Sequence, residues 1–176
     1  MLFAGLRISS AVTACTALLV TALAAAVSAD DLDGYVMAVH NHAPGHKQIE
    51  AGDYDKAIAV SLNARRAPPW KVSAETNLCV SYTVLKQYDR AQRACTKAIH
   101  AARSDRRLYL SLRRDSGTVL AQLYCNRGVL KAISEDLEGA AKDFSKARHY
   151  NADSEQYAVN YARLQKSLRV AQLDQK

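Results

Sequence analysis

Residues that interrupt helices are scarce in this sequence, which has 7 Gly and 3 Pro among its 176 residues. Alanine is frequent instead, and it is the most favourable helix residue because it loses no side-chain entropy there. Hydrophobic residues make up 49% and charged residues 23% of the chain, proportions that argue against a disordered protein. The length suits one domain. We therefore predict a single domain built mainly from helices.

Familiar signatures of catalysis are also missing. The chain has no G-x-S-x-G, no H-E-x-x-H, no glycine-rich phosphate loop and no C-x-x-C. Its one metal-like cluster is His40, His42 and His46, and Pro44 disrupts the helix that would align the last two. Histidines that face solvent or a partner are therefore the favoured interpretation. We expect no catalytic residue, no metal site and no cofactor, with an enzyme of unfamiliar type as the remaining alternative.

The segment 1–29 has the pattern of a signal peptide. Arg7 is the only charge before Asp30, an apolar run spans positions 8–27, and small residues close it at Ser28 and Ala29. This pattern predicts export to the periplasm or the exterior, with cleavage after Ala29. A membrane anchor is the alternative. A lipoprotein site at Cys15 is disfavoured because the apolar run continues beyond it.

The charge balance indicates the kind of partner. Removal of Arg7 lowers the formal net charge from +7 to +6. An exported protein rarely meets nucleic acid, so a protein or peptide partner is expected, with acidic proteins or anionic envelope polymers as the natural counterparts. A basic surface that is merely solvated is the simpler alternative. We expect no nucleic-acid partner and no stable membrane span after cleavage, and the oligomeric state is left open.

A periodic pattern runs through the rest of the chain. Tyr54 recurs at Tyr88 and Ala57 at Ala91, both at the same interval, and Ala140 follows Ala91 after that interval plus an insertion. Leu78, Tyr82 and Leu85 have the spacing of one helix face. Each copy is therefore predicted to form two antiparallel helices, and one such hairpin must stack on its neighbours to bury its apolar face.

A helix–turn–helix with this period, about 34 residues, and with these side chains resembles the tetratricopeptide repeat family. The small residue of the family's first helix falls on Gly45, Cys79, Gly128 and Ala162. Its two alanines of the second helix fall on Ala57, Ala91 and Ala140, and on Ala64, Ala98 and Ala147. Its large turn residue falls on Tyr54, Tyr88 and Leu137, and its closing proline on Pro69. Pro44 and Arg127 depart from the pattern, since both replace a large apolar residue.

The resemblance implies an all-α fold, an α-solenoid of about three hairpins and a C-terminal capping helix. We expect a signal peptide at 1–29, an N-terminal segment at 30–43, the repeat domain at 44–170 and a frayed tail at 171–176. Within the domain we expect repeats at about 44–71, 72–103 and 118–152, a basic insertion at about 102–117, and the capping helix at 154–170. Asp153 and Gln156 resemble a capping box for that helix.

Two further expectations depend on the repeat. Cys79 and Cys95 lie midway along facing helices of one hairpin, so a disulfide can form in an oxidising compartment, and two buried free thiols are the alternative. Asn77, Asn126 and Asn160 recur at one position, which faces the concave surface in the family's fold. A side-chain amide carries a donor and an acceptor, as an extended peptide's backbone requires. The predicted groove residues are Asn77, Val80, Asn126, Val129, Val159, Asn160, Arg163 and Lys166.

These features predict an exported interaction module that binds a peptide segment or a partner helix in the groove. An internal peptide segment is favoured over a terminal carboxylate, because the groove lacks flanking Lys or Arg at the required places. On this interpretation Asn126→Ala weakens binding and leaves the fold intact. The alternatives are asparagines that only hold the helices together, and a structural envelope subunit that docks through its convex face or its basic insertion.

Overall fold

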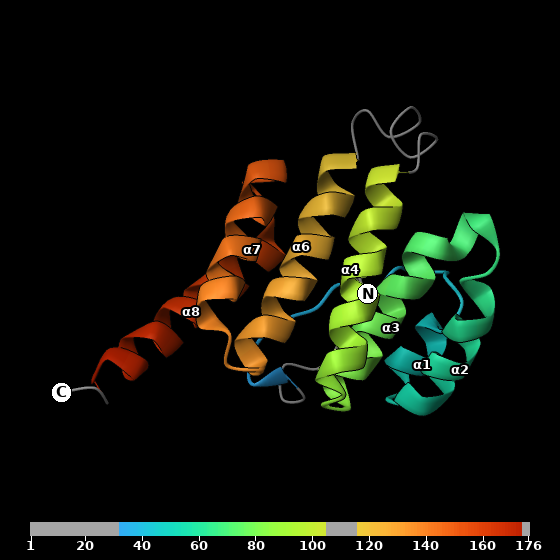
Figure 1. The fold of residues 1–176 in the computed structure, drawn as a ribbon, viewed down its shortest axis with the longest axis horizontal. Coiled ribbons are helices and arrows are strands. Elements are labelled where there is room, and N and C mark those ends of the chain that lie inside the picture. Colours follow the sequence, from blue (N-terminus) through green and yellow to red (C-terminus); the bar gives the residue numbers. More distant parts are fainter. Residues whose placement is uncertain (1–31, 105–115, 174–176) are drawn as a thin grey trace, which may run out of the picture.

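The computed structural model describes residues 32–104 and 116–173. Within these ranges the chain is all-helical, which confirms the predicted fold class of stacked helical hairpins (Figure 1). The helices are α1 (His46–Glu50), α2 (Tyr54–Ala64), the 3₁₀ turn η2 (Pro68–Trp70), α3 (Lys71–Val84), α4 (Tyr88–Ser104), α6 (Ser116–Ile133), α7 (Leu137–Tyr150) and α8 (Glu155–Leu173). The predicted signal peptide and most of the predicted insertion lie outside the described residues.

In the described part of the chain, three hairpins and the helix α8 form a solenoid. The pairs are α1 with α2, α3 with α4, and α6 with α7, and each hairpin packs on the next through α2 against α3 and α4 against α6. The single helix α8 packs against α6 and α7 at the end of the stack. In Figure 1, α4, α6 and α7 stand side by side, with α1 and α2 at one end and α8 reaching outward at the other.

Local sequence determines where the hairpins turn. Asp53 and Asp136 cap the second helices α2 and α7, because their side chains accept the backbone N–H groups of Lys56 and Gly139. Two positions before each second helix begins, the backbone is left-handed, at Gly52, Lys86 and Glu135, with φ of 72°, 56° and 68°. The turn geometry therefore repeats with the sequence, although glycine occurs at only one of these positions.

In each hairpin, one pair of facing residues lies where the two helices meet. The chemistry of this pair differs from hairpin to hairpin. Gly128 lies against Phe144, and a Cβ at residue 128 would come within 2.7 Å of the ring. The equivalent pair in the preceding hairpin is Cys79 and Cys95, which form a disulfide with Cα atoms 4.8 Å apart. In the first hairpin the same positions hold Gly45 and Ser61, and a Cβ at Gly45 would lie 2.5 Å from Ser61 Oγ. A small residue at the first position of each pair therefore lets the second helix approach.

Helix ends differ from expectation in three places. Ser154, not Asp153, caps α8, because Ser154 Oγ accepts the backbone N–H of Tyr157 at 3.3 Å. The helix then continues to Leu173, beyond the predicted end at residue 170. In the first hairpin, α1 begins at His46 and has only 5 residues, because Gly45 before it has a left-handed φ of 91°. The first repeat, expected from about residue 44, therefore opens with a short helix.

The N-terminal segment is part of the core. Residues Leu32, Tyr35, Met37 and Val39 are 1%, 3%, 0% and 9% exposed and belong to the same hydrophobic cluster as the hairpins. Figure 1 shows this segment crossing behind α6 and α4 on its way to α1. The sequence pattern places 30–43 outside the repeat domain, whereas the described part of this segment is packed against the first helices of the hairpins.

Candidate peptide-binding face

The three recurring asparagines lie in a row across the first helices. Asn77 belongs to α3, Asn126 to α6 and Asn160 to α8, and their exposed fractions are 0%, 1% and 0%. Asparagine is a poor residue for a helix interior, and a buried amide needs partners for both its donor and its acceptor. The identity of these partners determines what this face of the molecule does.

The partners belong to the chain itself. Residues 35–40, which we call the strap, run across the asparagine row in an extended conformation. Val36 donates its N–H to Asn160 Oδ1 at 2.8 Å, and Asn160 Nδ2 donates to Val36 O at 2.8 Å. Asn126 holds Ala38 in the same way, with distances of 2.9 and 2.8 Å. Each of these amides therefore satisfies both backbone groups of one residue.

The third asparagine binds where the strap ends. Asn77 Oδ1 accepts the N–H of His40 at 3.4 Å, and Asn77 Nδ2 donates to the carbonyl of Pro44 at 3.1 Å. The chain turns between these two residues, since His42 has a left-handed φ of 63°. One amide thus links the last strap residue to the segment that enters the first hairpin.

Successive residues of an extended chain point in alternate directions, which explains which strap residues contact the asparagines. Positions 36, 38 and 40 present their backbone groups to one edge, where the asparagine row lies. The side chains of Tyr35, Met37 and Val39 point into the core, as the period of two requires. The asparagine amides therefore bind an extended backbone, but this backbone is a segment of the same chain.

Gln156 is a further residue of this face. Its Nε2 donates to Asn126 Oδ1 at 2.9 Å and to Val36 O at 3.3 Å, so it joins the second asparagine to the strap. The sequence pattern indicates a capping box for Gln156, which is not among the predicted groove residues. The available signal was its spacing of four from Asn160, which places both side chains on one face of α8.

The other predicted groove residues divide into two groups. Val80 and Val129 are both 0% exposed and lie in the core beside the asparagines. Arg163 is half-buried and lies beside Gly34, where a Cβ would be 3.5 Å from Arg163 Nε. Val159 is 43% exposed and Lys166 is also exposed. The residue one period after Val129 is Arg163 and not Val159, which explains why Val159 lacks the burial of the other two valines.

The three histidines have different environments. His42 is exposed, whereas burial of His40 lowers the pKa of its imidazole below the usual value. His46 is 9% exposed, and its Nδ1 lies 3.4 Å from Glu50 Oε2, so of the two expected environments, solvent or a partner, this side chain does not have the first. No group of three metal-ligating side chains occurs among the described residues.

Among the described cysteines, Cys125 is the one outside the disulfide. It is 0% exposed, and burial raises the pKa of its thiol to about 12, partly offset by a hydrogen bond with Asn160. At neutral pH this cysteine is therefore protonated and serves as a small apolar side chain beneath the asparagine row.

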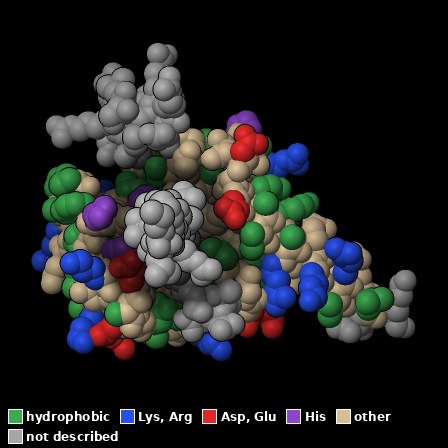
Figure 2. Space-filling view, turned by 180° about the vertical axis from the view of Figure 1, so that it is seen from behind, with side chains coloured by type: hydrophobic (Ala, Val, Ile, Leu, Met, Phe, Trp, Pro, Cys, Tyr) green, Lys and Arg blue, Asp and Glu red, His purple; other side chains and the backbone are tan. Residues whose placement is uncertain are grey.

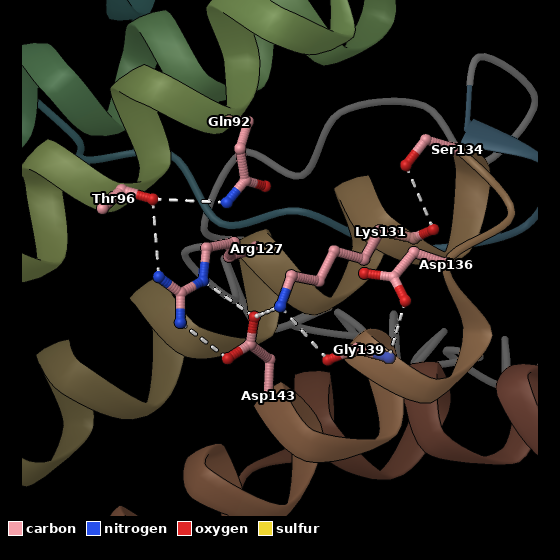
Figure 3. A network of polar contacts seen from close by, with 8 residues as sticks. All are labelled: Gln92, Thr96, Arg127, Lys131, Ser134, Asp136, Gly139 and Asp143. Carbon is pink, nitrogen blue, oxygen red and sulfur yellow. Dashed lines mark hydrogen bonds and ion pairs between the residues drawn. The ribbon is translucent and has the colours of Figure 1, made fainter.

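A buried charge cluster holds α6 against α7 (Figure 3). Asp143 accepts hydrogen bonds from Arg127 Nε and Nη2, both at 2.7 Å, and forms an ion pair with Lys131 at 2.9 Å. Burial raises the pKa of Asp143, but the hydrogen bonds from the two cations outweigh it, so the net shift is downward. Arg127 also donates to Thr96 on α4 at 3.4 Å. The departure of Arg127 from the family pattern is thus explained by a paired charge.

Comparison with known proteins gives one distant similarity. The chain is 26% identical over 117 residues to RNA polymerase II-associated protein 3 of Xenopus laevis. The match covers 66% of this chain and 16% of that protein, so the chain spans only a small fraction of its relative's length. No family model matches the chain, and no solved structure matches it. None of the described helices is long and apolar enough to cross a membrane.

Proposed function

We propose that this chain is an exported adaptor of the tetratricopeptide repeat type, which binds an extended segment of a protein partner on the face that carries the strap. The observation behind the proposal is the asparagine row, whose amides hold the backbone of an extended chain at Val36 and Ala38. The distant similarity to RNA polymerase II-associated protein 3 supports a protein-binding role. Export rests on the sequence pattern of the segment 1–29.

The strap remains in place when the partner binds. Tyr35, Met37 and Val39 are at most 9% exposed, so removing the strap would expose three large side chains and leave the asparagine amides unpaired. A tethered segment also has an effective local concentration in the millimolar range, which a free peptide must exceed. Competition for the asparagines is therefore unfavourable for an outside segment.

The partner uses the second edge of the strap. The peptide groups of Met37 and Val39 point away from the asparagine edge, because backbone groups alternate along an extended chain. They form no hydrogen bond with another residue of the ranges 32–104 and 116–173. An edge of this kind is suited to pair with one more extended segment, the mode of recognition by β-strand addition.

Site-specific photocrosslinking in the native host tests this function. A photoreactive phenylalanine at Val36, which is half-buried on the strap, should crosslink a partner protein in the exported fraction. The same group at Lys97, exposed on the second helix α4, serves as the matched control. Mass spectrometry should place the crosslink from residue 36 in an extended segment of the partner.

Two crosslinking outcomes would contradict the binding proposal. Crosslinks from Lys97, or from the same photoreactive group placed at Arg107 in the basic insertion, with none from residue 36, would favour the alternative of an envelope subunit that docks through its convex face or basic insertion. The purified, correctly folded chain can also be mixed with the partner. If no crosslink then forms from residue 36, the strap face is excluded as a binding site. Export with cleavage has its own test. Recovery of the uncleaved protein in the membrane, with the segment 1–29 still present, would contradict it.

A further inference from the structure

One face of α8 is not covered by a second helix among the described residues. In the second and third hairpins the small residue of the first helix is covered by the second helix, as Cys79 is by Cys95 and Gly128 by Phe144. Ala162 occupies this position on α8, one period after Gly128. No second helix follows α8 within the described residues, and Ala162 is exposed.

Apolar side chains gather on α8. Six large hydrophobic side chains are exposed in the described residues, and four of them belong to this one helix. These are Val159, Tyr161, Val170 and Leu173, at 43%, 39%, 51% and 70% exposed. Val159, Ala162, Lys166, Val170 and Leu173 follow one another at spacings of three, four, four and three, which places them along one side of the helix, with Lys166 within the apolar stripe. Scattered exposed apolar residues need no explanation, but a stripe on one helix marks an interaction surface.

The charges on the same helix are nearly all positive. Lys166 and Arg169 are exposed and Arg163 is half-buried, whereas Glu155 in the first turn is the one acidic side chain of α8. Figure 2 shows Lys and Arg side chains close to hydrophobic ones over the part of the molecule that extends toward the C-terminus. A second copy of the chain would bring cations against cations in an antiparallel pair, so this surface favours an acidic occupant.

We propose that this face of α8 docks an amphipathic helix of another protein, with small and apolar residues opposite the apolar stripe and Asp or Glu opposite its cations. The helix takes the place that the second helix occupies in the preceding hairpins, and its acidic residues face Lys166 and Arg169. This surface is separate from the strap edge, so the proposal stands or falls independently of the function proposed above.

A designed peptide provides a defined probe. In the third hairpin, α7 covers the equivalent face with Ala140, Phe144 and Ala147, all 0% exposed. The probe is a labelled, helix-stapled peptide with the sequence of 137–150 in which Lys142, Lys146 and Arg148 are replaced by Glu. Fluorescence anisotropy with the mature chain, 30–176, should show saturable binding that weakens as salt increases.

Variants of α8 locate the binding site. Ala162→Arg places a long cation where the helix must approach closely, and the double change Lys166→Glu with Arg169→Glu reverses the charge. Each should weaken binding about tenfold or more. Lys97→Glu, a charge reversal at an exposed site on α4, is the matched control and should leave binding unchanged. Because all these side chains are exposed, helicity and melting temperature should stay close to those of the unmodified chain.

The outcomes separate the possible occupants. Absence of saturable binding, or equal binding by Ala162→Arg and the unmodified chain, would overturn the proposal. Sedimentation is measured in parallel. Self-association of the mature chain that Ala162→Arg abolishes would assign the face to a second copy, which also contradicts an acidic partner helix.

Discussion

Phe144 covers Gly128 so closely that a Cβ at residue 128 would lie 2.7 Å from the ring. This contact fixes the distance between α6 and α7, and its counterpart between α3 and α4 is the disulfide between Cys79 and Cys95. The repeat therefore keeps a close approach of two helices while its chemistry changes from hairpin to hairpin. Changes at these contacts and at the strap should have measurable effects on stability.

Gly128→Ala should destabilise the protein. The new methyl group forces Phe144 or α7 to shift, which costs about 1–3 kcal/mol, while the better helix propensity of alanine returns up to about 1 kcal/mol. A net loss of about 1–2 kcal/mol is expected in chemical denaturation. The double variant Gly128→Ala with Phe144→Leu should show positive coupling, because the smaller side chain makes room. Strict additivity of the two changes would contradict direct packing.

Thiol counting checks the disulfide. The mature chain should show one reactive thiol after denaturation without reductant and none in the native state, because Cys125 is fully buried and protonated. Replacing both Cys79 and Cys95 by Ala should lower the free energy of unfolding by about 3 kcal/mol, since the bridge closes a loop with a sequence separation of 16. Three reactive thiols in oxidised, denatured protein would mean that the bridge does not form.

Asn126→Ala should release the strap and lower stability. The change leaves the N–H and carbonyl of Ala38 without their partners and removes an acceptor of Gln156. A loss of about 2–4 kcal/mol is expected, with faster amide exchange at Ala38. Asn63→Ala, at an exposed position of α2, is the control and should cost little. The sequence alone predicts an intact fold for Asn126→Ala, so unchanged stability would favour a groove that is open to an outside peptide.

Asp143→Asn should cost about 3 kcal/mol, because it leaves Arg127 and Lys131 partly buried without their shared carboxylate. The pH dependence has a defined sign. The pKa of Asp143 is lowered in the folded state, so its stabilising contribution is present above the unfolded value of about 3.9 and is lost as pH falls through the folded value. Denaturant titrations at pH 7 and at about pH 3 should therefore differ less for the variant than for the unmodified chain.

Lys86→Gly and Glu135→Gly should each stabilise the protein by about 0.5–1 kcal/mol. Both residues have a left-handed backbone, at φ of 56° and 68°, where glycine avoids the strain of a Cβ. Gly52→Ala is the reverse test and should lower stability, because φ at this residue is 72°. A Cβ there would meet no atom within 4 Å, so the effect reports backbone strain and not packing. A melting temperature that rises for Gly52→Ala would contradict the argument.

The helical hairpins could be predicted from the sequence because their determinants are local. The recurrence of Tyr54 at Tyr88 marks the turns, and apolar spacing marks the faces that must be buried. The same local information was insufficient at helix ends. Ser154 and Asp153 are both good capping residues, and the choice between them depends on where α8 packs against α6 and α7.

The asparagine row is also visible in the sequence, and amide chemistry indicates that it suits an extended backbone. Which backbone it holds was decided only by the tertiary structure. Val36 and Asn160 are 124 residues apart in the chain, and they meet because stacking of the hairpins brings the first helices α3, α6 and α8 into one face along which the strap can lie. Periodicity describes how each helix buries its own side chains, whereas the occupant of a face built from three hairpins depends on the stacking of all of them.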